Sequence, residues 1–237
     1  MNFYPRGLDL PRLLSPVNST LDMVFPQHCI ECNRWLISHE VWQLGCSLCE
    51  QQWPDLRGEV GEKLMKERCD LDRMWTGFRL RDNVTLEHQI RALKYHGDRQ
   101  LGLLWGRWVA NVSKVPKPSM APIGLVPVPL HWRRRWNRGF NQADWIAKGA
   151  AMEWNVPVYW RALFRPDHSR SHTGFSRKKR SDSSASAYQL GASPPPQGTK
   201  IILVDDVMTT GATLRACTSV LEAADCEVLG ALTLALA

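Results

Sequence analysis

Apolar residues in the middle of the chain recur at helical spacing. The segment LEHQIRALKYH places Leu86, Ile90 and Leu93 on one face and is followed by Gly97, which predicts a helix over 86–96 with a glycine stop. The next segment predicts a second helix, because its large apolar residues are spaced by threes and fours: Leu101, Leu104, Trp105, Trp108 and Val112. At this spacing we expect the two tryptophans to belong to the core rather than to a ligand-binding box.

Continuous apolar runs in the second half predict buried strands over 123–128, 201–204 and 227–237. Two helical patterns lie between them. The first begins at Asn141, and the second has its apolar face at Leu214, Cys217, Val220, Leu221 and Ala224. Alternating strands and helices indicate an α/β fold with a mostly parallel sheet flanked by helices.

One predicted strand-to-helix turn is strongly basic. Residues 131–140 connect the strand over 123–128 to the helix that begins at Asn141. The cations of this turn are Arg133, Arg134, Arg135 and Arg138. Ligands of α/β proteins bind at the carboxyl edge of the sheet, and cations at that edge suit a phosphate or a diphosphate.

A second strand-to-helix turn, in the segment VDDVMTTGAT, has phosphate-binding character. Its backbone N–H groups and the helix N-terminus that follows attract anions, and Gly211 lets the backbone come close to a ligand. Hydroxyl donors come from Thr209, Thr210 and Thr213. Asp205 and Asp206 would repel a phosphate, so we expect them to accept hydrogen bonds from vicinal hydroxyls, as carboxylates do for ribose. A sugar 5-phosphate fits both halves of the segment.

The size and charge of the chain narrow the class of protein. Its 237 residues suffice for one α/β core and a small appendage. Thirty Lys and Arg against 23 Asp and Glu give a net charge of +7, which favours anionic partners such as nucleic acid or phosphorylated metabolites. No apolar run is long enough to span a bilayer and none has the form of a signal peptide, so we expect no membrane insertion, a cytoplasmic location and reduced thiols.

Four of the seven cysteines form two CxxC pairs, Cys29 with Cys32 and Cys46 with Cys49. Thirteen residues separate the pairs, which is typical of a zinc ribbon. Four buried thiols or a redox dithiol are the alternatives. A small ribbon cannot bury enough apolar surface alone, so the zinc would be structural, with no coordination position left for catalysis. We expect buried core thiols at Cys69, Cys217 and Cys226.

Four blocks in this order resemble the ComF/GntX family of phosphoribosyltransferase-like proteins, which are associated with DNA uptake and use. The blocks are CxxC…CxxC, IRALKYHGDRQL, VPVPLHWRRRWNRGFNQA and VDDVMTTGAT, the last being similar to the phosphoribosyl pyrophosphate (PRPP) motif of type I phosphoribosyltransferases. The resemblance covers roughly residues 20–237. It implies a four-cysteine zinc ribbon over 20–60 and a type I phosphoribosyltransferase-like domain over 70–237.

The resemblance also implies roles for individual residues. Asp205 and Asp206 would contact ribose, while Lys94 and the 133–138 turn would lie on the pyrophosphate side, with Mg²⁺ held chiefly by PRPP itself. The loop that would hold the 5-phosphate is Thr209, Thr210, Gly211, Ala212 and Thr213.

The chain departs from the family pattern at two places. In the Ser-, Lys- and Arg-rich segment 165–188, His172 and Ser183 stand where members carry Gln and Asn. This segment is either a flap over the site or an idle surface loop. The second cysteine pair of longer members is missing, and Cys69 stands as its remnant.

Three functions are compatible with these features. The first is a PRPP-binding protein that acts in the uptake or use of single-stranded DNA together with the DNA-uptake machinery, its basic, tryptophan-bearing turn touching the strand. The second is an active phosphoribosyltransferase with an unknown acceptor, although Thr209 stands where purine salvage enzymes place an acid. The third is a zinc-ribbon regulator that senses PRPP.

Overall fold

The computed structural model divides the chain into two compact units, Met1–Glu50 and Gln51–Ala237, which are described separately. It describes residues 28–29, 32–36, 46–50, 63, 66–79, 84–95, 98–113, 122–131, 133, 136, 138–166 and 187–237. In the first unit the described residues include one short helix, α2 (Ser47–Glu50), and an antiparallel bridge between His28 and Trp35. The boundaries expected for the ribbon and the larger domain remain predictions.

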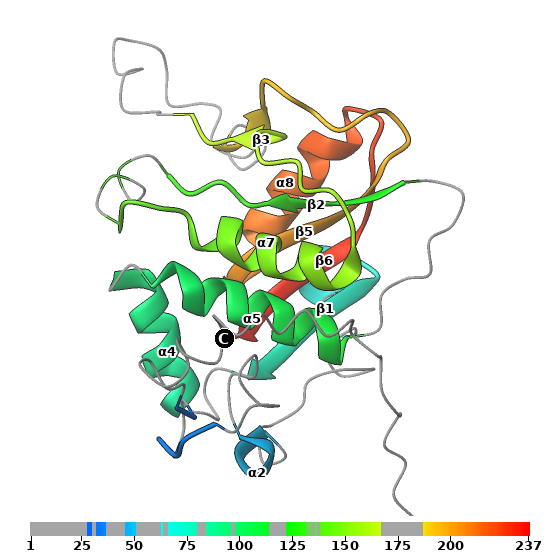
Figure 1. Cartoon of the computed structure of the whole chain (residues 1–237). Coiled ribbons are helices and arrows are strands. Elements are labelled where there is room, and N and C mark those ends of the chain that lie inside the picture. Colours follow the sequence, from blue (N-terminus) through cyan, green and yellow to red (C-terminus); the bar gives the residue numbers. More distant parts are fainter. Residues whose placement is uncertain are drawn as a thin grey trace, which may run out of the picture. The chain divides into compact units, whose positions relative to one another are not determined.

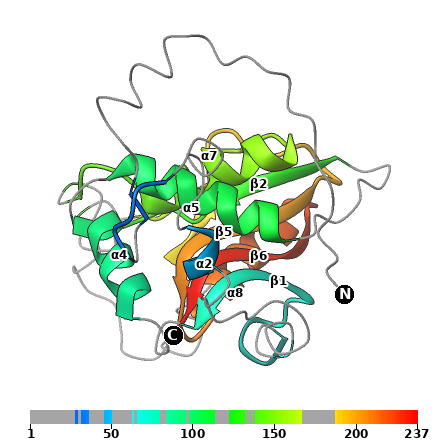
Figure 2. The ribbon, with the colours of Figure 1, turned by 60° about the horizontal axis from the view of Figure 1, so that its bottom comes forward.

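The larger unit is built on a four-stranded sheet in the order β1-β6-β5-β2, in which every pair is parallel (Figures 1 and 2). Its strands are β1 (Arg73–Arg79), β2 (Ile123–Pro127), β5 (Lys200–Met208) and β6 (Glu227–Leu236). All five residues of β2 and the last seven of β6 are buried, as expected for strands covered on both faces. The predicted mostly parallel sheet flanked by helices is therefore confirmed.

The connections leave β5 and β2 in opposite directions. The chain passes from β5 through α8 (Ala212–Glu222) to its neighbour β6, and from β2 through α7 (Gln142–Trp154) to Val158, which bridges Leu125 in parallel. Because such crossovers are right-handed, the two helices cover opposite faces, with α7 in front of the sheet and α8 behind it (Figure 1). The carboxyl ends of β2 and β5 thus form a topological switch point, where open α/β sheets bind ligands.

Two more helices follow β1, α4 (Val84–Tyr95) and α5 (Arg99–Val112), and α5 packs against α7. A Cβ at Gly106 would overlap the carbonyl oxygen of Ile146, and one at Gly149 would overlap that of Leu103. The two helices therefore touch backbone to backbone. The indole of Trp154 also donates a hydrogen bond of 2.9 Å to the carbonyl of Ala110.

This close contact changes which face of α5 is buried. The sequence predicted a face of large apolar residues, but the buried stripe is Gly102, Trp105, Gly106, Val109 and Ala110. Trp105 is a core residue as expected, whereas Trp108 is only half-buried. The pattern of large side chains missed the stripe because glycines allow the closest approach of two helices and carry no hydropathy signal.

The strands show two further differences from prediction. The strand expected over 201–204 continues to Met208, because β6 pairs with it as far as Leu236. Asp205 and Asp206 therefore lie within a strand rather than after one. Neither β1 nor the antiparallel pair β3 (Leu163–Phe164) and β4 (Gln189–Leu190) was predicted.

Other expectations agree with the described residues. Cys69, Cys217 and Cys226 are buried, and the predicted helices correspond to α4, α5, α7 and α8. Most of the expected flap, including His172 and Ser183, lies outside the described residues. None of the helices in the described ranges combines the length and the apolar character needed to cross a membrane.

Candidate functional site

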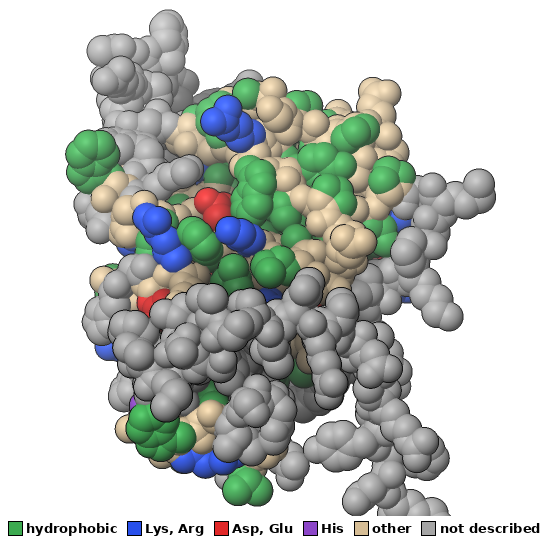
Figure 3. Space-filling view, in the orientation of Figure 1, with side chains coloured by type: hydrophobic (Ala, Val, Ile, Leu, Met, Phe, Trp, Pro, Cys, Tyr) green, Lys and Arg blue, Asp and Glu red, His purple; other side chains and the backbone are tan. Residues whose placement is uncertain are grey.

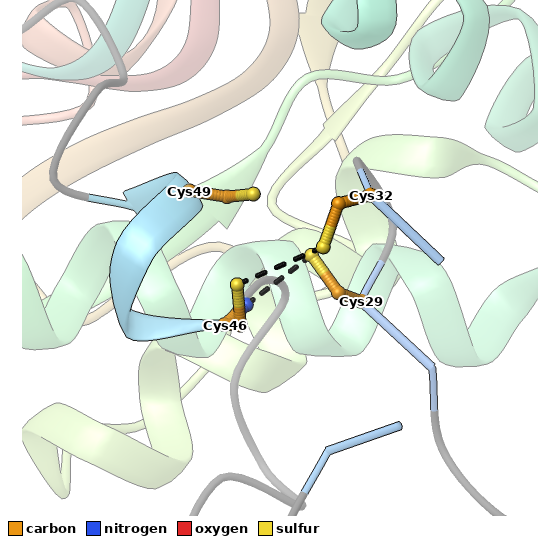
Figure 4. A group of neighbouring side chains, drawn as sticks. All are labelled: Cys29, Cys32, Cys46 and Cys49. Atoms are coloured by element: carbon orange, nitrogen blue, oxygen red, sulfur yellow. Dashed lines mark hydrogen bonds between the residues drawn. The ribbon is translucent and has the colours of Figure 1, made fainter. Parts of the chain in front are cut away.

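The first unit gathers its four cysteines into one cluster (Figure 4). The Sγ atoms of Cys29, Cys32, Cys46 and Cys49 all lie within 4.8 Å of one another. Cys49 is on α2. Cys29 begins a tight turn, in which its carbonyl accepts a hydrogen bond of 2.9 Å from the N–H of Asn33. Asn33 has a φ of 59°, the left-handed conformation that Asn tolerates, and this closes the first CxxC turn.

The cluster has the dimensions of a zinc site. Zinc binds thiolates at about 2.3 Å in a tetrahedron, whose edges are then about 3.8 Å. The sulfurs of Cys32 and Cys46 are 3.8 Å apart, and the N–H of Cys46 points at the Cys29 sulfur from 3.3 Å. A hydrogen bond to Arg34 lowers the pKa of Cys46 to about 6, whereas burial and then the neighbouring sulfurs raise the pKa of Cys49, so the fit to zinc rests on the sulfur geometry. The four residues therefore fit zinc.

In the second unit a pocket of about 400 Å³ opens at the carboxyl ends of β2 and β5. This volume lies within the usual range for small-molecule sites, and the pocket occupies the switch point of the sheet. Its polar lining comes from five parts of the chain: Lys94, Arg138, Asn141, Gln142, Arg165, Tyr188, Asp205, Asp206, Thr209 and Thr213. Segments far apart in sequence thus meet where ligand binding was expected.

The two aspartates of β5 face different partners, because consecutive strand residues point to opposite sides. Lys94 Nζ of α4 lies 3.2 Å from Asp206 Oδ2, and the two side chains are 22% and 16% exposed. Asp205 accepts a hydrogen bond of 2.8 Å from the backbone N–H of Asp206. Burial raises the pKa values of Tyr188 and Cys217, and the negative charge of Asp205 adds to both shifts. The site thus holds one acid paired with a lysine and one acid held by a backbone N–H.

These surroundings set the protonation of the pair. Removal of water from around Asp205, followed by the negative charge of Asp206, raises the pKa of Asp205 to about 7. The backbone N–H of Asp206 and the charge of Lys94 act in the opposite direction but do not outweigh burial. Near neutral pH Asp205 is therefore poised to release a proton when a ligand offers hydroxyl donors to its carboxylate.

The loop between β5 and α8 has the form of an anion-binding turn. Gly211 precedes the helix with a φ of +75°, and the N–H of Ala212 lies 3.4 Å from Thr210 Oγ1. Thr209 and Thr213 line the pocket, whereas Thr210, Gly211 and Ala212 form the turn beside it. The helix N-terminus and these hydroxyls together can bind a phosphate.

Sequence reasoning missed the residues that hold this loop from behind. Arg68 Nη1 donates a hydrogen bond of 2.6 Å to the carbonyl of Thr209 and another of 2.9 Å to the carbonyl of Ala237. A Cβ on Gly211 would overlap Cys69 Sγ and stand 2.7 Å from the carbonyl oxygen of Arg68. No motif marks Arg68, since its role depends on the pairing of β6 beside β5.

The structure describes two of the four arginines predicted in the basic turn, Arg133 and Arg138. Arg138 lines the pocket, donates 3.2 Å to Gln142 Oε1 and stacks 5.5 Å from the ring centroid of Tyr95. Arg133 is exposed and does not line it. Arg134 and Arg135 lie outside the described residues.

Arg165 is a cation of the pocket to which the sequence assigned no role. It donates 3.2 Å to the hydroxyl of Tyr188, and its guanidinium lies 5.3 Å from the centroid of that ring. Lys94, Arg138 and Arg165 thus surround the two acids with positive charge. Such a lining suits a ligand that combines hydroxyls with several phosphates.

Comparison with known proteins finds similarity to one protein family and to several curated proteins. Residues 168–237 match the family model described as phosphoribosyl transferase domain. The chain is 32% identical over 119 residues to competence protein F of Haemophilus influenzae, covering 50% of this chain and 52% of that protein. It is 33% identical over 140 residues to competence protein ComFC of Bacillus subtilis, covering 56% and 52% of the two chains.

A third relative is DNA utilization protein YhgH of Escherichia coli K12, with 33% identity over 93 residues, 39% of this chain and 40% of that protein. The chain spans about half or less of the length of these curated relatives. Their names concern competence and DNA utilization.

Proposed function

Because this chain is a ComF-family phosphoribosyltransferase-like protein, we propose that it binds PRPP in the pocket at the ends of β2 and β5 and acts in the uptake or use of single-stranded DNA. The observation that carries the proposal is the meeting of a carboxylate pair, a phosphate-binding turn and three cations in that one pocket. A ribose that carries a 5-phosphate and a diphosphate uses all three: carboxylates for its hydroxyls, the turn for the 5-phosphate and the cations for the diphosphate.

Each part of PRPP has a counterpart among the lining residues. The carboxylates of Asp205 and Asp206 accept hydrogen bonds from the two ribose hydroxyls, and Thr209 and Thr213 with the N-terminus of α8 hold the 5-phosphate. The cations Lys94, Arg138 and Arg165 face the diphosphate. Mg²⁺ fits this set of oxygen-bearing groups and would arrive with the diphosphate, neutralising part of its charge.

Ligand fragments test this assignment directly. Mg²⁺-PRPP, ribose 5-phosphate and diphosphate are each added to the zinc-loaded chain, and the midpoint of thermal unfolding is measured, since a ligand stabilises the state it binds. Thr213→Val should abolish the response to ribose 5-phosphate and keep that to diphosphate, while Arg138→Gln should do the reverse. Glu222→Gln, an exposed acid of α8 outside the pocket, is the control. Equal responses of all variants to PRPP would place its binding elsewhere.

The link to DNA rests on different residues. Trp136 of the basic turn is 85% exposed, and Arg133 beside it is exposed as well, so a ring and a cation are available to stack on a base and to pair with a phosphate. Binding of a single-stranded oligonucleotide should weaken steeply with salt and change when Mg²⁺-PRPP is added. Release of diphosphate from PRPP would instead identify an active phosphoribosyltransferase.

A further inference from the structure

A second cavity adjoins the PRPP pocket, and most of its lining residues have no role in the proposed binding of PRPP. It measures about 540 Å³ and shares four lining residues with that pocket: Pro129, Leu130, Asn141 and Arg165. Its other wall is the segment from Trp160 to Arg165, together with Gly191 and Ala192. We call this cavity the aromatic pocket.

The wall of the aromatic pocket is firmly built. Ala162 is fully buried and Leu163 is 5% exposed, so the segment is anchored in the core. The N–H of Gly191 donates 2.7 Å to the carbonyl of Ala162, and the N–H of Ser193 donates 3.2 Å to that of Arg161. Burial and backbone hydrogen bonds therefore hold this wall of the cavity in place.

Two large aromatic side chains are nevertheless left half-exposed along this anchored wall. Trp160 is 49% exposed and Phe164 is 44% exposed, and both line the cavity. In the space-filling view the surface between β3 and α7 carries hydrophobic side chains next to cationic and acidic ones (Figure 3). Exposed rings on a concave, mixed surface are typical of a site that stacks a planar ligand.

The polar groups of the cavity narrow the ligand further. Asn141 Nδ2 donates 2.8 Å to Asp144 Oδ1 and 3.0 Å to the carbonyl of Val128, which orients the Asp144 carboxylate at the cavity. A carboxylate has about four acceptor positions, so it can also accept from the amino group of a base. Arg161 and Arg165 supply cations to the same cavity, which suits a phosphate.

We propose that the aromatic pocket binds a nucleotide unit: Trp160 and Phe164 stack on the base, Asp144 accepts from its amino group, and Arg161 pairs with its phosphate. The unit comes either from a free nucleotide or from a single strand, and the strand as source rests on the proposed function. Since the carboxylate selects an amino group, cytosine binds better than thymine. Arg165 and Leu130 line both pockets, so occupation of one affects the other.

Binding is measured by fluorescence anisotropy with labelled oligo-dC and oligo-dT of equal length, and by competition with free dCMP. Trp160→Ala/Phe164→Ala should weaken oligo-dC by about tenfold or more, since stacking dominates sequence-tolerant binding of single strands. Met152→Ala, an exposed apolar residue of α7 outside both pockets, should bind normally. Asp144→Asn should bring oligo-dC down to the affinity of oligo-dT.

The outcomes separate the two proposals. Competition by dCMP at concentrations close to those of the oligonucleotide identifies a free nucleotide as the source, and its absence identifies a strand. Failure of both ligands to bind, or unchanged oligo-dC affinity in the folded Trp160→Ala/Phe164→Ala variant, overturns the inference. Mg²⁺-PRPP is titrated into the same variants. If the wild type binds oligo-dC but does not bind Mg²⁺-PRPP, the proposed binding of PRPP is refuted and the inference about the aromatic pocket still holds.

Discussion

Replacing Gly211 with alanine tests how the phosphate-binding turn is held. Gly211 has a φ of +75°, and Cys69 Sγ and the Arg68 carbonyl lie where a Cβ atom on this residue would stand. The substitution adds one methyl group, so it perturbs two separable features: the backbone conformation and the contact with the segment behind the turn. Gly198 has a φ of +74°, and a Cβ there would meet no atom within 4 Å, so Gly198→Ala carries the first perturbation alone.

The magnitudes follow from these surroundings. A left-handed alanine costs about 1–2 kcal/mol of folding free energy. Overpacking against buried atoms adds about 1–3 kcal/mol, because the Arg68 carbonyl is backbone and cannot rotate away. We therefore expect Gly211→Ala to cost about 2–5 kcal/mol and Gly198→Ala about 1–2 kcal/mol. Adding Cys69→Ala to Gly211→Ala removes the clash with the sulfur but not the clash with the Arg68 carbonyl. The double variant should therefore recover only part of the stability that separates Gly211→Ala from Gly198→Ala.

Urea unfolding of the zinc-loaded chain followed by far-ultraviolet circular dichroism measures these free energies, provided that both glycine variants keep the wild-type denaturant slope. The folded Gly211→Ala variant should also bind Mg²⁺-PRPP more weakly, whereas Gly198→Ala should bind it normally. If Gly211→Ala costs no more than Gly198→Ala, the contact with Arg68 and Cys69 does not shape the turn, and the reasoning is wrong.

Three further predictions concern other parts of the molecule. The pKa of Asp205 is raised to about 7, so the folded state holds this proton more tightly than the unfolded state. The free energy of unfolding without ligand, measured in urea, should therefore fall by about 2 kcal/mol between about pH 5.5 and 7.5. Asp205→Asn should remove that fall. The purified chain should contain about one zinc ion, and Cys46→Ser should lose it, as measured by metal analysis. Gly106→Ala should cost about 1–3 kcal/mol in urea unfolding, because its methyl group would overlap the Ile146 carbonyl between α5 and α7.

Much of the fold could be predicted because its signals are local. The buried strands are continuous apolar runs, and the helices that follow them have apolar residues at helical spacing, as β5 and α8 illustrate. The cysteine cluster was equally visible, since two CxxC turns determine their own geometry. Strand β1 was not predicted, because RMWTGFR has no long apolar run and is a strand only through its pairing with β6.

Only the part of the site that is contiguous in sequence could be predicted in full. The turn after β5 was visible because its Asp, Thr and Gly residues are contiguous. Arg68 and Arg165 reach the same site from distant segments, and no sequence pattern brings them there. The aromatic pocket was missed for a similar reason: Trp160 and Phe164 meet Asp144 only after α7 and β3 have packed around the end of β2.

Calorimetric titration of the zinc-loaded chain with Mg²⁺-PRPP measures directly whether the pocket at the ends of β2 and β5 binds PRPP, with Asp205→Ala/Asp206→Ala as the variant and Glu222→Gln as the control. We expect saturable binding of one PRPP per chain, unchanged in the control and weakened about tenfold or more in the folded double variant, because hydrogen bonds to charged groups contribute about 1.5–3 kcal/mol each. Absence of binding by the folded wild type, or equal affinity of the double variant, would mean that PRPP does not bind at these carboxylates.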